Sequence, residues 1–149
     1  MPTKTRLNFF PRLVMERPDI ALCRVSTLIT RAAELQGHAN NVGANHHLVL
    51  KMLVNVGPCS QQTLSEELRI DRSVMVGIAD DLQKAGYVSR ERNPDDRRAY
   101  QVDITGAGKT ALLHAESSVP KFLNDVFAAL TAAERDQLTK ILAKVLEID

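Results

Sequence analysis

The segment from Thr63 to Gly108, TLSEELRIDRSVMVGIADDLQKAGYVSRERNPDDRRAYQVDITGAG, carries most of the capping and turn signals in this 149-residue chain. It begins just after Ser60, a good N-cap for a short helix whose apolar residues lie one turn apart. A second helix, capped by Asp71 or Ser73, ends at Gly86 and has its apolar residues at Val74, Ile78 and Leu82. Two short capped helices in a row predict a helix-turn-helix.

Beyond Gly86 the apolar period changes from helical to alternating, which is typical of strands. Residues 87–92 predict one strand, and the next contains Tyr100, Val102 and Ile104. The sequence between them, Asn93-Pro94-Asp95-Asp96, consists of residue types that favour turns. We therefore expect a β-hairpin directly after the helix-turn-helix.

Amphipathic helices are predicted on both sides of this segment. Before it, residues 19–39 follow the helical period, and Asn45 can cap a second helix that ends at Gly57-Pro58. After it, a helical stretch begins at Thr105-Gly106 and contains Pro120, which is expected to kink the helix or to break it in two.

The last helix begins at Thr131-Ala-Ala-Glu134, which matches a capping box. The predicted element order is α-α-α-α-β-β-α-α. This order indicates a mainly α (α+β) fold within a single domain, residues 1–149.

Composition excludes several classes of protein. The net charge is only +1, and aromatic residues are 4% with no Trp, which argues against an aromatic platform for single-stranded nucleic acid. No apolar run reaches the about 18 residues of a membrane helix. The two cysteines lack CxxC spacing, and enzyme motifs such as G-x-S-x-G are absent from the sequence. We expect a soluble, cytoplasmic protein that is not an enzyme, with no cofactor and no membrane partner.

The start of the second helix of the helix-turn-helix is the candidate DNA-reading surface. The major groove admits an α-helix, and the N-terminal residues of a recognition helix come nearest the base edges. Arg72 can contact a phosphate or guanine, and Ser73 can donate or accept a hydrogen bond. Val74 and Met75 can contact thymine methyl groups, although we expect one of the two to pack in the core.

The predicted hairpin adds Arg92, Arg97 and Arg98 as DNA-binding candidates. A guanidinium on a thin hairpin can enter the minor groove, and Asp96 can orient a neighbouring arginine. Taken alone, the DDRR sequence also fits a solvated turn whose charges pair with one another. Its place after two capped helices and before a further helix start favours DNA binding.

The segment, and above all KAGYVSRERNPDDRRAYQVDIT followed by G-x-G, resembles the winged helix-turn-helix of the MarR family of bacterial transcriptional regulators. The resemblance implies a cytoplasmic homodimer that binds a pseudo-palindromic operator on double-stranded DNA. It implies dimerisation helices at 19–39 and 109–148 around a DNA-binding lobe at 45–105. It also implies a repressor that responds to a small-molecule effector of the aromatic acid or phenolic type.

This chain departs from the family pattern in its recognition helix. Many members carry Thr and Arg where Val76 and Gly77 stand here, and Asp80 and Asp81 reduce the positive charge of the helix. We include Gly77 among the DNA-binding candidates and expect affinity to depend on the hairpin and on three further residues: Ser60, Gln61 and Arg72.

Asn45, His46 and His47 are candidates for effector binding, because the resemblance places the start of their helix near the ligand crevice. An exposed helix start explains the same residues without a ligand. The four histidines, His38, His46, His47 and His114, lack the spacing of a metal site, so no metal is predicted.

Two other functions remain open at this stage. One is a helical dimerisation or protein-interaction module that binds no specific DNA. The other is a redox-sensing regulator that uses Cys23, although a buried structural cysteine is the preferred interpretation of that residue. For Cys59 we expect greater exposure.

Overall fold

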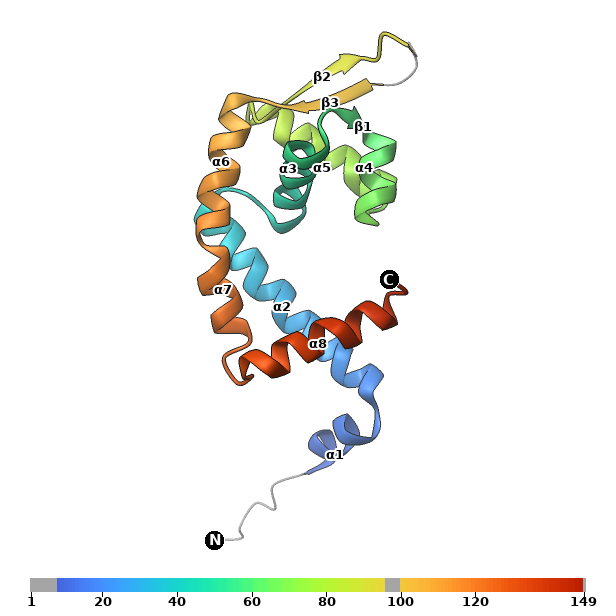
Figure 1. The fold of residues 1–149 in the computed structure, drawn as a ribbon, viewed down its shortest axis with the longest axis vertical. Coiled ribbons are helices and arrows are strands. Elements are labelled where there is room, and N and C mark those ends of the chain that lie inside the picture. The colour runs from blue at the N-terminus through green and yellow to red at the C-terminus, as the bar shows by residue number, and fades with distance from the viewer. Residues whose placement is uncertain (1–7, 96–99, 149) are drawn as a thin grey trace, which may run out of the picture.

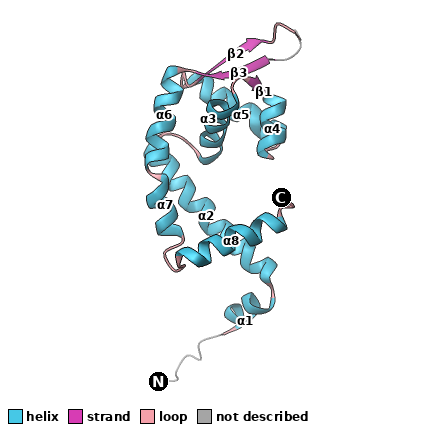
Figure 2. Cartoon of the chain, viewed as in Figure 1, coloured by secondary structure: helices cyan, strands magenta, loops and turns pink. Residues whose placement is uncertain are grey.

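The computed structural model describes residues 8–95 and 100–148. Its fold is mostly helical with one small antiparallel sheet, which confirms the predicted fold class (Figures 1 and 2). The elements in chain order are α1 Phe9–Glu16, α2 Pro18–Asn40, α3 Ala44–Val56, β1 Cys59–Ser60, α4 Gln61–Leu68, α5 Arg72–Lys84, β2 Val88–Arg92, β3 Tyr100–Ile104, α6 Gly106–Ser117, α7 Val119–Val126 and α8 Ala132–Val145.

Two elements go beyond the predicted order, namely α1 and β1. Helix α1 has only eight residues and contains Pro11, so its period is too short to stand out. Strand β1 has two residues, and its pairing with β3 is not visible in the local sequence. The predicted break at Pro120 is confirmed, since the proline lies in the first turn of α7.

Helix starts agree with the local sequence at several positions and differ at one. Ser60 accepts a hydrogen bond from the backbone N–H of Thr63 at 3.0 Å, and Thr131 and Glu134 form a complete capping box. Helix α3 begins two residues earlier than expected, at Ala44, with Gly43 rather than Asn45 as its N-cap. Asn45 therefore lies within the first helical turn.

The hydrophobic core lies in one part of the molecule, residues 42–115, which we call the winged lobe. The strand order in its sheet is β1-β3-β2, and every pairing is antiparallel. Helices α3, α4, α5 and α6 pack with this sheet at the top of Figure 1. The core comprises Val42, Val49, Leu50, Leu53, Leu64, Met75, Ile78, Leu82, Val88, Val102, Leu112 and Ala115.

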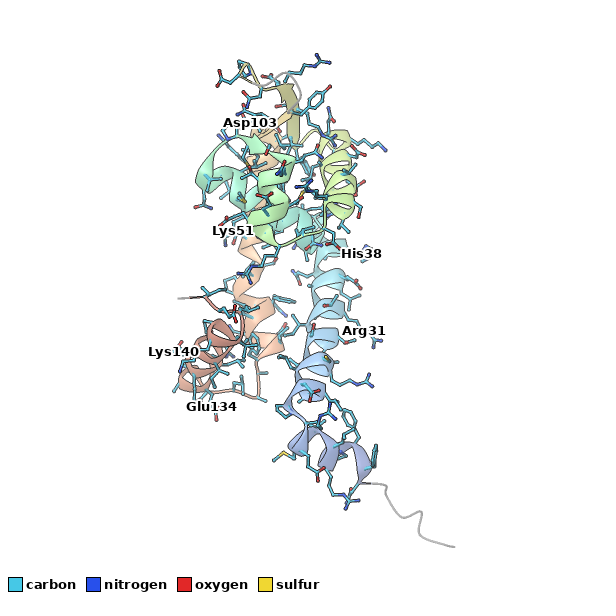
Figure 3. The ribbon with its side chains drawn as sticks, turned by 90° about the vertical axis from the view of Figure 1, so that its right-hand side faces the viewer. Arg31, His38, Lys51, Asp103, Glu134 and Lys140 are labelled. Atoms are coloured by element: carbon cyan, nitrogen blue, oxygen red, sulfur yellow. The ribbon has the colours of Figure 1, made fainter. Side chains whose placement is uncertain are left out.

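The remaining helices, residues 9–40 and 119–145, form what we call the helical arm. It extends below the lobe, with α2 beside α7 and α1 at its far end, while α8 follows α7 and stands apart from α2 in the side view (Figures 1 and 3). Of the arm residues that the structure describes, Gly37 alone is buried. Large apolar side chains are correspondingly exposed: Leu22, Val25, Leu28, Leu35, Leu123, Ile141 and Val145.

Among the described residues, no helix is both long enough and apolar enough to cross a membrane.

Candidate nucleic-acid interface

Helix α4 is fixed to the sheet by the two residues that precede it. Cys59 and Ser60 pair with Val102 and Gln101 of β3, and the Ser60 side chain then caps α4. The Ser60 hydroxyl is therefore engaged within the protein, while Ser60 and Gln61 are both half-buried. Their backbone stands at the N-terminus of a helix, where a phosphate is favoured.

A tight turn connects α4 to α5, the predicted recognition helix. Arg69 adopts the left-handed conformation with φ of 53°, and the Ile70 N–H donates to the Ser65 carbonyl at 3.0 Å. Ser65 is itself buried. Three residues thus separate the two helices, and their relative orientation is set by backbone hydrogen bonds and by their shared core.

Helix α5 has one buried face and one exposed face. Met75 is fully buried and lies on the same face as Ile78 and Leu82, so its prediction as a base-contacting residue is wrong. Val74 is 47% exposed, as expected for the other member of that pair, so its predicted place on the apolar face with Ile78 and Leu82 is wrong. In the first two turns of α5 the exposed residues are Arg72, Ser73, Val74, Val76 and Gly77, and Asp80 and Asp81 are exposed further along the helix.

Gly77 and Gly108 differ in how closely other atoms approach them. A Cβ atom on Gly77 would meet nothing within 4 Å, so the protein itself does not require glycine there. A Cβ on Gly108 would lie 2.1 Å from the Tyr87 carbonyl oxygen. The second glycine of the G-x-G at the start of α6 is therefore explained by the close approach of α6 to the chain that enters β2, whereas a Cβ on Gly106 would meet nothing within 4 Å.

Thr105 links the base of the hairpin to α6. Its hydroxyl donates to the Gly86 carbonyl at 2.6 Å and accepts from the Gly108 N–H at 3.1 Å. Its backbone N–H donates to the Tyr87 carbonyl at 3.0 Å. These hydrogen bonds fix the base of the β2–β3 hairpin, the wing, relative to α5 and α6.

The two aspartates of α5 are both paired within the lobe. Arg90 of β2 forms a salt bridge with Asp80, and the Arg90 side chain is only 18% exposed. His46 Nε2 lies 3.0 Å from Asp81 Oδ2. Asp80 therefore attaches the recognition helix to the wing, a role that the sequence prediction missed because the two residues belong to different elements.

Cationic side chains remain exposed both at the start of α5 and on the wing. Arg72 has a long, solvent-exposed contact of 3.7 Å with Glu66, which holds it weakly. Arg92 is exposed on the wing, with its guanidinium 5.9 Å from the ring centre of Tyr100, its cross-strand partner. Three predicted residues of the wing tip, Asp96, Arg97 and Arg98, lie outside the described residues.

A separate cavity of about 320 Å³ lies between the arm and the lobe, lined by residues of α2, α3, α6 and α7. His47 Nε2 and Lys51 Nζ each lie 3.1 Å from the same oxygen, Oε1 of Glu116. Lys51, labelled in Figure 3, lies at the lower edge of the lobe beside α6. Hydrogen bonds from His47 and Lys51 lower the pKa of Glu116 below its ordinary value.

Among the three predicted ligand-binding residues, His47 alone lines this cavity. Asn45 is exposed, and His46 points to Asp81 on α5, so the cavity does not bring these two together with His47. Adjacent residues on a helix point about 100° apart, which explains why the two histidines contact different elements.

The two cysteines differ from expectation in opposite ways. Cys23 is exposed on α2, so the interpretation as a buried cysteine is wrong for the single chain. Cys59, for which we expected more exposure, is half-buried, and burial raises the pKa of its thiol. A raised pKa lowers the thiolate fraction and hence the reactivity of Cys59.

Sequence comparisons point in one direction. A family model described as MarR family matches residues 40–99. A putative transcriptional regulatory protein for the hcr operon of Thauera aromatica is 32% identical over 101 residues, which cover 68% of this chain and 61% of that protein. The transcriptional repressor MprA of Escherichia coli K12 is 32% identical over 83 residues, which cover 56% of this chain and 47% of MprA. The chain thus spans about half to three fifths of these two relatives.

Solved structures share the fold at lower identity. A mutant MarR from E. coli complexed with operator DNA has a TM-score of 0.80 at 23% identity, covering 90% of this chain and 97% of MarR. BpsR of Bordetella bronchiseptica, whose structure concerns the regulation of its DNA binding by 6-hydroxynicotinic acid, has a TM-score of 0.79 at 22% identity, covering 87% and 92%. The family model, the sequence relatives and the winged fold agree: this chain belongs to the MarR family of transcriptional regulators.

Proposed function

We propose that this protein is a dimeric transcriptional regulator that binds double-stranded DNA through α5 and the wing. The observation that carries the proposal is the exposed face of α5. Its first residues present a cation, a hydroxyl and two valines to solvent, while the opposite face is held by the core. That combination suits a helix inserted into a major groove.

We infer different roles for the arginines of the lobe from the contacts that each one makes. Arg72 and Arg92 remain exposed and are the described side chains best placed to neutralise phosphates or to enter the minor groove. Arg90 instead forms a salt bridge with Asp80. We propose that Arg90 positions the wing relative to α5, so that both elements meet the duplex together.

The arm supports a homodimer. Helices α1, α2, α7 and α8 line an open groove of about 940 Å³ whose walls are mainly apolar. A contiguous apolar surface of this kind is uncommon on a monomer. Dimers with two-fold symmetry match pseudo-palindromic DNA sites, whose half-sites lie about 34 Å apart. We propose that a second copy of the chain covers the groove and spaces the two recognition helices.

A small molecule in the cavity between α2, α3, α6 and α7 is the proposed effector. The cavity lies where the arm meets the lobe, so a ligand there can favour one relative orientation of the two parts. If that orientation places the recognition helices at the wrong spacing, ligand and DNA oppose each other's binding by linkage. The protein would then be a repressor that its ligand releases.

The experiment that tests this function is a fluorescence anisotropy titration. It compares the DNA duplex directly upstream of the gene that encodes this protein with a scrambled duplex of equal length. We expect tight binding to the first, and we expect Arg72→Ala to weaken it about tenfold, within the range for removal of a base-specific hydrogen-bonding pair. Arg31→Ala, a change of equal charge on α2, is the matched control (Figure 3). Equal affinity for both duplexes would instead favour a dimerisation or protein-interaction module.

A further inference from the structure

The polar end of the cavity is already neutralised by the protein. Glu116 on α6 accepts from two donors on α3, His47 and Lys51, and both contact the same carboxylate oxygen at 3.1 Å. With a neutral imidazole, the three side chains sum to zero charge. The Lys51 ammonium, the cation that an acidic ligand would need, is thus engaged by a carboxylate of the protein.

The Glu116 carboxylate is less exposed to solvent than the Lys51 ammonium that pairs with it. The Glu116 side chain is 31% exposed and that of Lys51 is 54% exposed, so solvent screens the lysine more than the glutamate. A ligand carboxylate placed against His47 would also lie close to Glu116. Like charges at such a distance repel, and the repulsion grows as water is excluded.

The rest of the cavity suits an uncharged ring compound. Its apolar wall includes Val42, Leu48, Val119 and Phe122. At its rim the Asn40 amide donates to the Ser118 hydroxyl at 2.9 Å, which offers neutral hydrogen-bonding groups rather than charges. A volume of about 320 Å³ is at the small end of ligand pockets, which favours a compact molecule.

We propose that this cavity selects a small uncharged ring compound bearing a hydroxyl, carbonyl or amide group, and discriminates against the corresponding carboxylate, because Glu116 occupies Lys51 and His47. The inference rests on the proposed function, in which this cavity binds the effector.

The test uses benzamide and benzoate, which share shape and differ in charge, with binding to the full chain measured by isothermal titration calorimetry at neutral pH. We expect the wild-type protein to bind benzamide about tenfold more tightly than benzoate, equivalent to about 1.4 kcal/mol. In Glu116→Gln, Lys51 loses its carboxylate partner. Benzoate should therefore gain about tenfold in affinity while benzamide changes little.

Glu67→Gln, the same substitution on the exposed face of α4, is the matched control and should leave both affinities unchanged. Benzoate binding to wild type at least as tightly as benzamide would overturn the proposal, and so would a failure of both probes to bind. DNA binding by the same preparation separates the two ideas. If DNA binds and the probes do not, the ligand inference fails while the regulator function stands.

Discussion

The winged lobe and the helical arm are both built from amphipathic helices, yet they use their apolar residues differently. In the lobe, residues such as Leu50 and Leu64 are completely buried within one chain. In the arm, Leu28 is 65% exposed and Leu35 is 72% exposed. The lobe therefore covers its apolar side chains within one chain, whereas the arm leaves apolar side chains exposed to solvent.

The largest effect on stability should come from the lobe core. Leu64→Ala removes a side chain with no exposed surface, and truncations of this kind cost about 2–5 kcal/mol. Urea unfolding measures the destabilisation, which should be independent of protein concentration. Leu35→Ala on the arm is the comparison, and its effect should depend on concentration. Equal, concentration-independent effects would contradict the distinction between the two parts.

A charge in the arm groove should abolish assembly while leaving the lobe folded. Leu28 lines the groove, so Leu28→Glu would place a carboxylate in the proposed interface. Light scattering after size-exclusion chromatography should show a monomer, with helical circular dichroism largely retained. Thr30→Glu adds the same charge to an exposed residue of α2 outside the groove and should remain dimeric. If Leu28→Glu remained dimeric as well as Thr30→Glu, the proposed interface would be refuted.

Glu116, at the junction of the lobe and the arm, is expected to make the stability of the folded protein depend on pH. The pKa of Glu116 in the folded protein is lowered from its ordinary value of 4.5. The Glu116 carboxylate therefore takes up a proton less readily in the folded state than in the unfolded state. Its stabilisation is therefore fully present above pH 4.5 and is lost as the pH falls through the lowered pKa. We expect Glu116→Gln to destabilise the protein near neutral pH and the difference from wild type to shrink in acid. A difference that stays constant down to low pH would contradict this account.

The smallest effect on stability is expected at Gly77. Because a Cβ there meets nothing, Gly77→Ala should stabilise helix α5 by about 0.5–1 kcal/mol. Thermal denaturation measures this increase, and a decrease in stability would show that the site is more constrained than the structure indicates. If DNA approaches the backbone at Gly77, operator affinity should fall in the same variant.

The sequence could predict those features that depend on neighbouring residues. The Ser60 cap, the capping box at Thr131 and the helix break at Pro120 all lie within a few residues of the partners they act on. The spacing did not decide between Val74 and Met75, because both lie about one turn from Ile78, and the structure buries Met75.

Interactions between distant elements could not be predicted in this way. Asp80 and Arg90 belong to a helix and a strand, and Glu116 meets Lys51 only because α6 packs beside α3. Of the aspartates that looked like unfavourable charges on a DNA-reading helix, Asp80 is therefore engaged in an ion pair with Arg90, and Asp81 contacts His46. Local sequence could not show this, because those pairings depend on the fold.

The salt dependence of DNA affinity measures how many phosphates the protein neutralises when it binds DNA. Each phosphate that the protein neutralises contributes about 0.9 to the magnitude of the slope of log affinity against log salt concentration. A dimer that binds through Arg72 and Arg92 of both copies should give a steep slope, and Arg92→Ala should reduce its magnitude by about 0.9 for each phosphate that is no longer neutralised. Binding to the upstream duplex with a slope near zero, or a slope that Arg92→Ala leaves unchanged, would contradict the proposed interface.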